Sequence, residues 1–105
     1  MKTFRKILTP VDFTPVSNAA IAHAIGIVKA INGKLILFHV VKNSKELAEG
    51  QHKMEALLNK LILEHPDVQM KFIVRIGDIF EAVGNAALEN NVQLIIMGTH
   101  GLKGF

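Results

Sequence analysis

The sequence of 105 residues contains no cysteine, no tryptophan and no tyrosine. Without cysteine the chain can form neither a disulfide framework nor a thiolate metal site, and it has no cysteine nucleophile. Phenylalanine supplies all six aromatic side chains, so few rings are available to stack on nucleic-acid bases. These absences exclude several kinds of chemistry and argue against nucleic acid as a partner.

A strong charge of one sign and a long apolar run are also missing. Twelve Lys and Arg residues stand against nine Asp and Glu, which gives a net charge of only +3. The most apolar long stretch, residues 19–31, contains His23 and Lys29 and is too short and too polar to span a bilayer. No secretion signal is visible in the first five residues. We therefore expect one cytoplasmic domain over residues 1–105 that binds neither nucleic acid nor membrane.

Apolar segments with strand character alternate with segments that have helix signals. We expect strands at residues 6–11, 35–41, 68–76 and 92–97. Helices are expected at about 15–31, between the capping box at 43–46 and Pro66, and from Asp78 to about Asn90. Thr14 and Asp78 are the expected N-caps of the first and third helices. This order predicts an α/β fold with three layers (α/β/α), a doubly wound parallel sheet and the strand order 3-2-1-4.

A doubly wound sheet binds ligands beyond the carboxyl ends of its strands, where the strand order reverses. In the expected order, that point lies between the first and fourth strands, so residues 11–14 and 97–101 should border the crevice. Asp12 is then either a turn or cap residue or a carboxylate that hydrogen-bonds a ligand, and its position favours neither role. Thr14 fits a helix cap better than a catalytic hydroxyl.

The glycine-rich end of the sequence matches no complete nucleotide-binding motif. Gly98 and Gly101 form a G-x-x-G turn, but neither a Walker A loop nor a Rossmann fingerprint is present. Two glycines after a buried strand mark either a tight turn or a backbone cradle for an anion.

The polar residues show no catalytic or metal-binding arrangement. The five histidines lack the i, i+4 spacing of a metal pair, and no Ser-His-Asp order or carboxylate pair stands out. His39 lies in an apolar strand and is expected to be a hydrogen-bonded core residue. We therefore expect a binding domain that contains no metal site and is not an enzyme.

Three segments together resemble the universal stress protein domain: residues 6–14 (KILTPVDFT), 37–40 (LFHV) and 95–101 (IIMGTHG). The resemblance implies a role in the stress response through binding or sensing an adenine nucleotide, ATP or AMP, with Mg²⁺ possible alongside ATP. It implies that Pro10 and Asp12 line the adenine and ribose region and that Val40 packs against adenine. It further implies that Met97 and Gly98 border the nucleotide, and that Gly101 turns the chain around the phosphates.

The family's phosphate motif continues with nine residues and then G-[ST], a half that would begin past Phe105. We therefore expect a domain that is incomplete at its C-terminus, without the fifth strand and last helix, and whose nucleotide binding is weak or absent. The apolar segment 94–96 would form an exposed edge and favour a homo-oligomer. The alternative function is a dimerisation or interaction module of the same fold that binds no nucleotide.

Overall fold

The computed structural model describes residues 5–98. Its helices and strands follow one another in regular alternation: β1 (Lys6–Pro10), α1 (Pro15–Ile31), β2 (Lys34–Val41), the short 3₁₀ helix η1 (Ser44–Glu46), α2 (Leu47–Glu64), β3 (Gln69–Ile76), α3 (Ile79–Glu89) and β4 (Leu94–Ile95).

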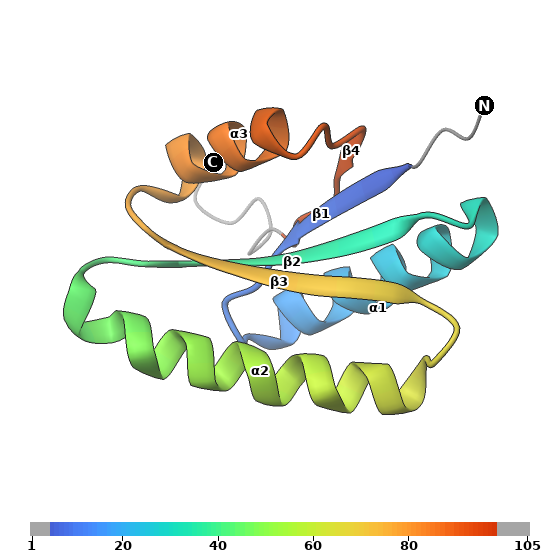
Figure 1. Cartoon of the computed structure of the whole chain (residues 1–105), viewed down its shortest axis with the longest axis horizontal. Helices are drawn as coiled ribbons and strands as arrows, with labels where there is room; N and C mark the ends of the chain where they lie inside the picture. The colour runs from blue at the N-terminus through green and yellow to red at the C-terminus, as the bar shows by residue number, and fades with distance from the viewer. Residues whose placement is uncertain (1–4, 99–105) are drawn as a thin grey trace.

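The described strands form one parallel sheet in the order β3-β2-β1-β4. Helices α1 and α2 cover one face of this sheet, and α3 covers the other (Figure 1). The predicted α/β fold, its strand order 3-2-1-4 and its three layers are therefore confirmed. Within residues 5–98, no helix has both the length and the apolar character needed to cross a membrane.

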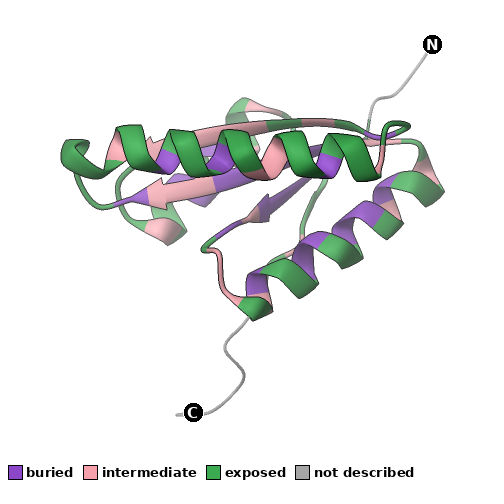
Figure 2. Cartoon of the chain, turned by 90° about the horizontal axis from the view of Figure 1, so that it is seen from below, coloured by how far each residue is buried: buried purple, intermediate pink, exposed green. Residues whose placement is uncertain are grey.

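The two central strands are buried on both faces, which explains their almost continuous apolar sequence. Ile7 and Leu37 face α1 and α2, whereas Leu8 and Phe38 face α3. The four residues 35–38 are each no more than 1% exposed. The helices bury one side each and leave the other in water, as Figure 2 shows. The sheet thus separates two cores that share its central strands.

Local capping positions the helices as the sequence indicates. The Ser17 amide donates to Thr14 Oγ1 at the start of α1, and the Glu81 amide donates to Asp78 Oδ2 at the start of α3, each over 3.2 Å. Asn32 ends α1 in the left-handed conformation. The predicted capping box at 43–46 takes another form, because Asn43 caps η1 and α2 begins only at Leu47.

Strand β4 is shorter than predicted, since only Leu94–Ile95 pair regularly with β1 instead of residues 92–97. The amide of Val92 bonds to Ala87 O and belongs to the end of α3. Ile96 packs into the core beneath α1 and α2. The apolar residues around β4 therefore fill both cores and do not extend the strand.

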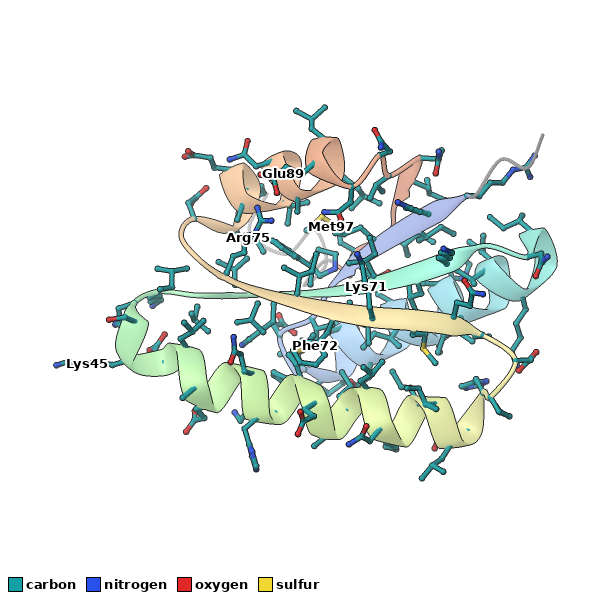
Figure 3. All side chains as sticks on the ribbon, in the orientation of Figure 1. Lys45, Lys71, Phe72, Arg75, Glu89 and Met97 are labelled. Carbon is teal, nitrogen blue, oxygen red and sulfur yellow. The ribbon has the colours of Figure 1, made fainter. Side chains whose placement is uncertain are left out.

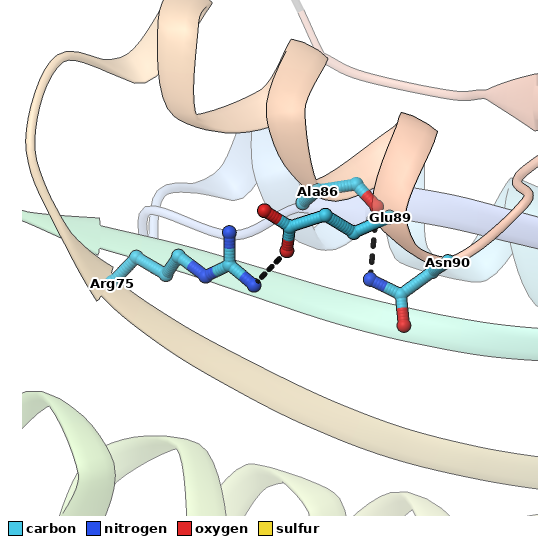
Figure 4. A network of polar contacts seen from close by, with 4 residues as sticks. All are labelled: Arg75, Ala86, Glu89 and Asn90. Atoms are coloured by element: carbon cyan, nitrogen blue, oxygen red, sulfur yellow. Dashed lines mark hydrogen bonds and ion pairs between the residues drawn. The ribbon is translucent and has the colours of Figure 1, made fainter.

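Strand β3 is the opposite edge of the described sheet, and an ion pair ties it to α3. Arg75 Nη2 donates to Glu89 Oε1 over 2.5 Å, while the side chain of Asn90 donates to Ala86 O (Figure 4). The bond to Arg75 holds the pKa of the Glu89 carboxyl below its usual value, and the same bond raises the pKa of Arg75. The pair is largely exposed, so it orients α3 more than it stabilises the fold.

One buried polar group offers a test of this core. The hydroxyl of Thr9, in the middle of β1, is fully buried and has no hydrogen-bond partner among residues 5–98. Replacing it by a methyl group should remove a desolvation cost, so Thr9→Val should raise the free energy of unfolding by about 1 kcal/mol. Urea unfolding followed by circular dichroism measures the change.

Thr14→Val is the matched control, because the same chemical change removes the N-cap of α1. That variant should lose about 1 kcal/mol. A destabilised Thr9→Val protein would show that the buried hydroxyl is hydrogen-bonded.

Candidate functional site

A pocket of about 550 Å³ opens at the carboxyl ends of the strands. Its lining comes from the end of every strand and from the first residues of α1 and α3: Pro10, Val11, Asp12, Val16, Ser17, Val40, Val41, Lys42, Gly77, Asp78, Ile79, Met97 and Gly98. Since β1 lies between β2 and β4, the connections from β1 and β3 leave for opposite faces and open this space. The pocket therefore occupies the crevice that the strand order predicts.

Five of the six predicted site residues line this one pocket, although they come from three separate segments of the chain. They are Pro10, Asp12, Val40, Met97 and Gly98. The sixth, Gly101, lies outside the described residues. What these residues bind remains a prediction at this point, but the structure brings them together.

Asp12 takes part in a turn and also lines the pocket. Its Oδ1 accepts hydrogen bonds from the amide of Thr14 at 3.1 Å and from the Thr14 hydroxyl at 2.6 Å. The Asp12 amide donates to Ser17 Oγ over 3.1 Å. The two roles that the sequence left open are therefore compatible, because the turn holds the carboxylate at the pocket wall.

The backbone between β1 and α1 is strained at Phe13, whose φ of 63° is unusual for a bulky residue. The Phe13 ring packs edge-on against His39, with 5.1 Å between ring centroids, and the Lys53 ammonium lies 5.3 Å from its centroid. His39 Nδ1 is 2.7 Å from Val11 O. The expectation of a hydrogen-bonded His39 is confirmed, although the ring is only half-buried. These contacts hold the loop that presents Asp12.

The pocket combines apolar walls with a few charges. Val40 is half-buried and Met97 is 42% exposed, so both present apolar surface to a ligand. Asp12 and Asp78 supply carboxylates, and Lys42 supplies an ammonium group. Over the described residues, no cluster of three or more His, Asp or Glu side chains could hold a metal ion. This composition suits a largely flat organic ligand that also carries polar groups.

Sequence reasoning missed the part of the wall that β2 and β3 contribute. Lys42 follows β2, and Gly77 with Asp78 follows β3, so each stands at the same edge of the sheet as Asp12. All parallel strands end at one edge, and that rule alone could have nominated these three residues. Asp78 was expected only as the cap of α3, which it also is.

Gly98 brings the chain after β4 against the start of α1. A Cβ atom built on Gly98 would lie 2.5 Å from Val16 Cγ1 and 2.7 Å from Val16 O. No side chain fits at these distances unless one of the two segments moves. The glycine therefore lets the chain after β4 pack closely against the start of α1 at the wall of the pocket.

Comparisons with known proteins point to one family. The model of the universal stress protein family matches residues 3–105. No curated protein matches the sequence. Several solved structures do, and their likeness at low identity establishes the shared fold.

The universal stress protein UspA from Lactobacillus plantarum is 21% identical with a TM-score of 0.79, and the match covers 100% of this chain and 86% of that one. A universal stress protein family member from Burkholderia pseudomallei is 20% identical with a TM-score of 0.75, over 92% and 83% of the two chains. A universal stress protein in complex with cAMP is 18% identical with a TM-score of 0.65, over 90% and 76%.

The close approach at Gly98 can be tested directly. Gly98→Ala should lower the free energy of unfolding by about 1–3 kcal/mol, because the new methyl group meets the Val16 backbone. Gly84→Ala is the control, since nothing lies within 4 Å of a Cβ at that exposed position in α3. It should stabilise the protein by about 0.5–1 kcal/mol through helix propensity. Thermal or urea unfolding compares the two, and equal effects would contradict the role given to Gly98.

Proposed function

The chain belongs to the universal stress protein family, and from this premise we propose that its main pocket binds an adenine nucleotide. One observation carries the proposal: segments far apart in the sequence converge on a single pocket at the point where the strand order reverses. The pocket volume of about 550 Å³ falls in the usual range for small-molecule sites. The family resemblance assigned the same residues to the nucleotide.

The chemistry of the wall suits the parts of a nucleotide. Val40 and Met97 offer apolar surface for the flat faces of the adenine ring. The Asp12 carboxylate can accept a hydrogen bond from a ribose hydroxyl or from the adenine amino group. Lys42 carries the ammonium group of the described lining and could pair with a phosphate. In this proposal Gly101 turns the chain around the phosphates.

The comparison with the cAMP complex supports the nucleotide class. That protein has the same fold and holds an adenine nucleotide. For the present chain we propose ATP or AMP as the ligand, and Mg²⁺ would enter with the phosphates of ATP, because this ion commonly bridges a carboxylate and substrate phosphates.

We propose binding or sensing in the stress response, in the cytoplasm, and not catalysis. The carboxylates of Asp12 and Asp78 both accept hydrogen bonds from the turns that begin α1 and α3. These bonds give each carboxylate a structural task in a turn, which suits recognition better than proton transfer. An ATP hydrolysis assay that detects turnover would overturn this part.

Calorimetric titration with ATP, AMP and cAMP tests the nucleotide proposal. We expect binding of at least one of them, and Asp12→Asn should weaken it by about tenfold or more through loss of a charge-assisted hydrogen bond. The asparagine side chain can still accept the bonds from Thr14, so the turn and the fold should persist.

Asp67→Asn is the control, because Asp67 is exposed in the connection between α2 and β3, away from the pocket. Its affinity should match that of the unchanged protein. An absence of binding at millimolar nucleotide would refute the proposal and favour the second candidate.

The second candidate function is an interaction module that pairs through β4. Leu94 is 45% exposed and Ile95 is 39% exposed on this edge strand, and neither position carries a charge. An uncharged apolar edge favours pairing with another strand. We therefore propose a homo-oligomer that forms through β4.

Multi-angle light scattering over a range of concentrations tests the edge. Leu94→Lys should shift the protein toward the monomer, because a charge on the edge opposes strand pairing. Leu63→Lys adds the same charge at an 83% exposed position on α2 and should leave the assembly unchanged. A monomer at every concentration would rule out pairing through β4.

A further inference from the structure

Helix α3 leaves part of its sheet face uncovered at the amino ends of the strands. Three apolar side chains, one from each strand, pack beneath α3: Leu8, Ile36 and Ile73. Alternate residues along a strand point to the same face. Two residues before each of these apolar side chains stands a lysine: Lys6, Lys34 and Lys71. All three lysines therefore lie on the same face of the sheet, in the part that α3 does not cover.

The three lysines line one hollow of about 220 Å³. The rest of its lining is uncharged: Leu35, Ile36, Gln69 and Met70. Figure 3 shows Lys71 and Phe72 on opposite sides of β3, with Phe72 toward α2. The hollow thus has three cations and no carboxylate in its described wall. We call this hollow, with its three lysines Lys6, Lys34 and Lys71, the lysine hollow.

The strand register concentrates this charge. Lys6 is the direct partner of Lys34 across neighbouring strands, which lie about 4.8 Å apart. Lys71 pairs with Ile36, so it lies diagonally from Lys34 at about 7–8 Å. Like charges opposite one another destabilise a sheet. Lysine on the edge strand β3 can be explained as protection against unwanted pairing, but β1 and β2 are inner strands and need no such protection.

A neighbouring cation, Arg75, is neutralised by a carboxylate of α3. Arg75 lies on the same face of β3 and pairs with Glu89 of α3. Among the described residues the other ion pair joins Lys53 to Glu49, on α2. Neither pair involves Lys6 or Lys71, so these two side chains can take an anionic partner without first breaking an ion pair.

We propose that the lysine hollow binds an extended acidic peptide segment of a partner protein, with Asp or Glu at alternate positions. In an extended chain, carboxylates at positions i and i+2 point to one side and lie about 6.5–7 Å apart. That spacing matches the diagonal between Lys34 and Lys71. The uncharged floor of the hollow accepts the backbone of the segment.

Nucleic acid is the less suitable polyanion for this surface. Single-stranded binding sites combine cations with aromatic rings on which the bases stack. Within residues 5–98, no aromatic side chain lines the hollow: Phe38 is fully buried beneath α3, and Phe72 lies on the other face. The hollow also lies at the amino ends of the strands, whereas the proposed nucleotide pocket lies at the carboxyl ends.

The experiment uses a fluorescent eight-residue peptide that alternates Glu and Ser, and a peptide with Gln in place of Glu. Fluorescence anisotropy at low salt should show binding of the acidic peptide only, and binding should weaken as salt is raised. The triple variant Lys6→Gln, Lys34→Gln, Lys71→Gln should lose affinity by about tenfold or more. Amide shifts in nuclear magnetic resonance spectra should cluster at residues 6, 34 and 69–71.

A second triple variant, Lys29→Gln, Lys45→Gln, Lys60→Gln, is the matched control. These exposed lysines lie on α1, η1 and α2, and Lys45 points away from the body of the molecule (Figure 3). Both variants lower the formal net charge by three, from +3 to zero. Melting curves confirm that both variants fold, and ATP titration should give the same result for each.

Three outcomes would overturn the proposal. An equal loss of peptide binding in both triple variants would assign the attraction to net charge and not to the hollow. Binding of a single-stranded oligonucleotide through the same lysines, without binding of the peptide, would assign the surface to nucleic acid. If the unchanged protein does not bind the acidic peptide, the proposal is wrong, and this result does not depend on what the nucleotide pocket binds.

Discussion

The position of β1 between β2 and β4 is the constraint on which the ligand-binding end of the molecule depends. A right-handed crossover from β1 to β2 puts α1 on one face, and the crossover from β3 back to β4 puts α3 on the other. The two helices therefore diverge at the carboxyl end of β1. The topology places the residues after β1 at this opening, and the side chains of those residues determine which ligand can bind there.

Much of the fold could be predicted because its signals are local or periodic. Thr14 and Asp78 cap helices through contacts within three residues, and the apolar run of β2 reports burial on both faces. The strand order could be predicted from the alternation of strands and helices together with the right-handedness of the crossover connections. The site residues Asp12, Val40 and Met97 followed from the resemblance, and the order of the strands brought them to one place.

The remaining features depend on contacts that no local pattern encodes. Strand β4 is short because the residues that flank it pack into different cores: Val92 contacts the core under α3, and Ile96 contacts the core under α1 and α2. The left-handed conformation of Phe13 rests on contacts with His39 and Lys53 from other elements. The lysine hollow depends on register, because a shift of one residue in β2 would turn Lys34 to the opposite face.

The two outer strands of the sheet differ in charge, and this difference limits how copies can associate. Strand β3 carries Lys71, which makes no ion pair with the described residues, whereas β4 presents Leu94 and Ile95. Two copies joined through β4 would form one continuous sheet with a β3 strand at each end. The lysine at each of those ends would oppose further strand pairing, so growth would stop at two copies and the proposed assembly would be a closed, twofold-symmetric pair that does not extend into a fibre.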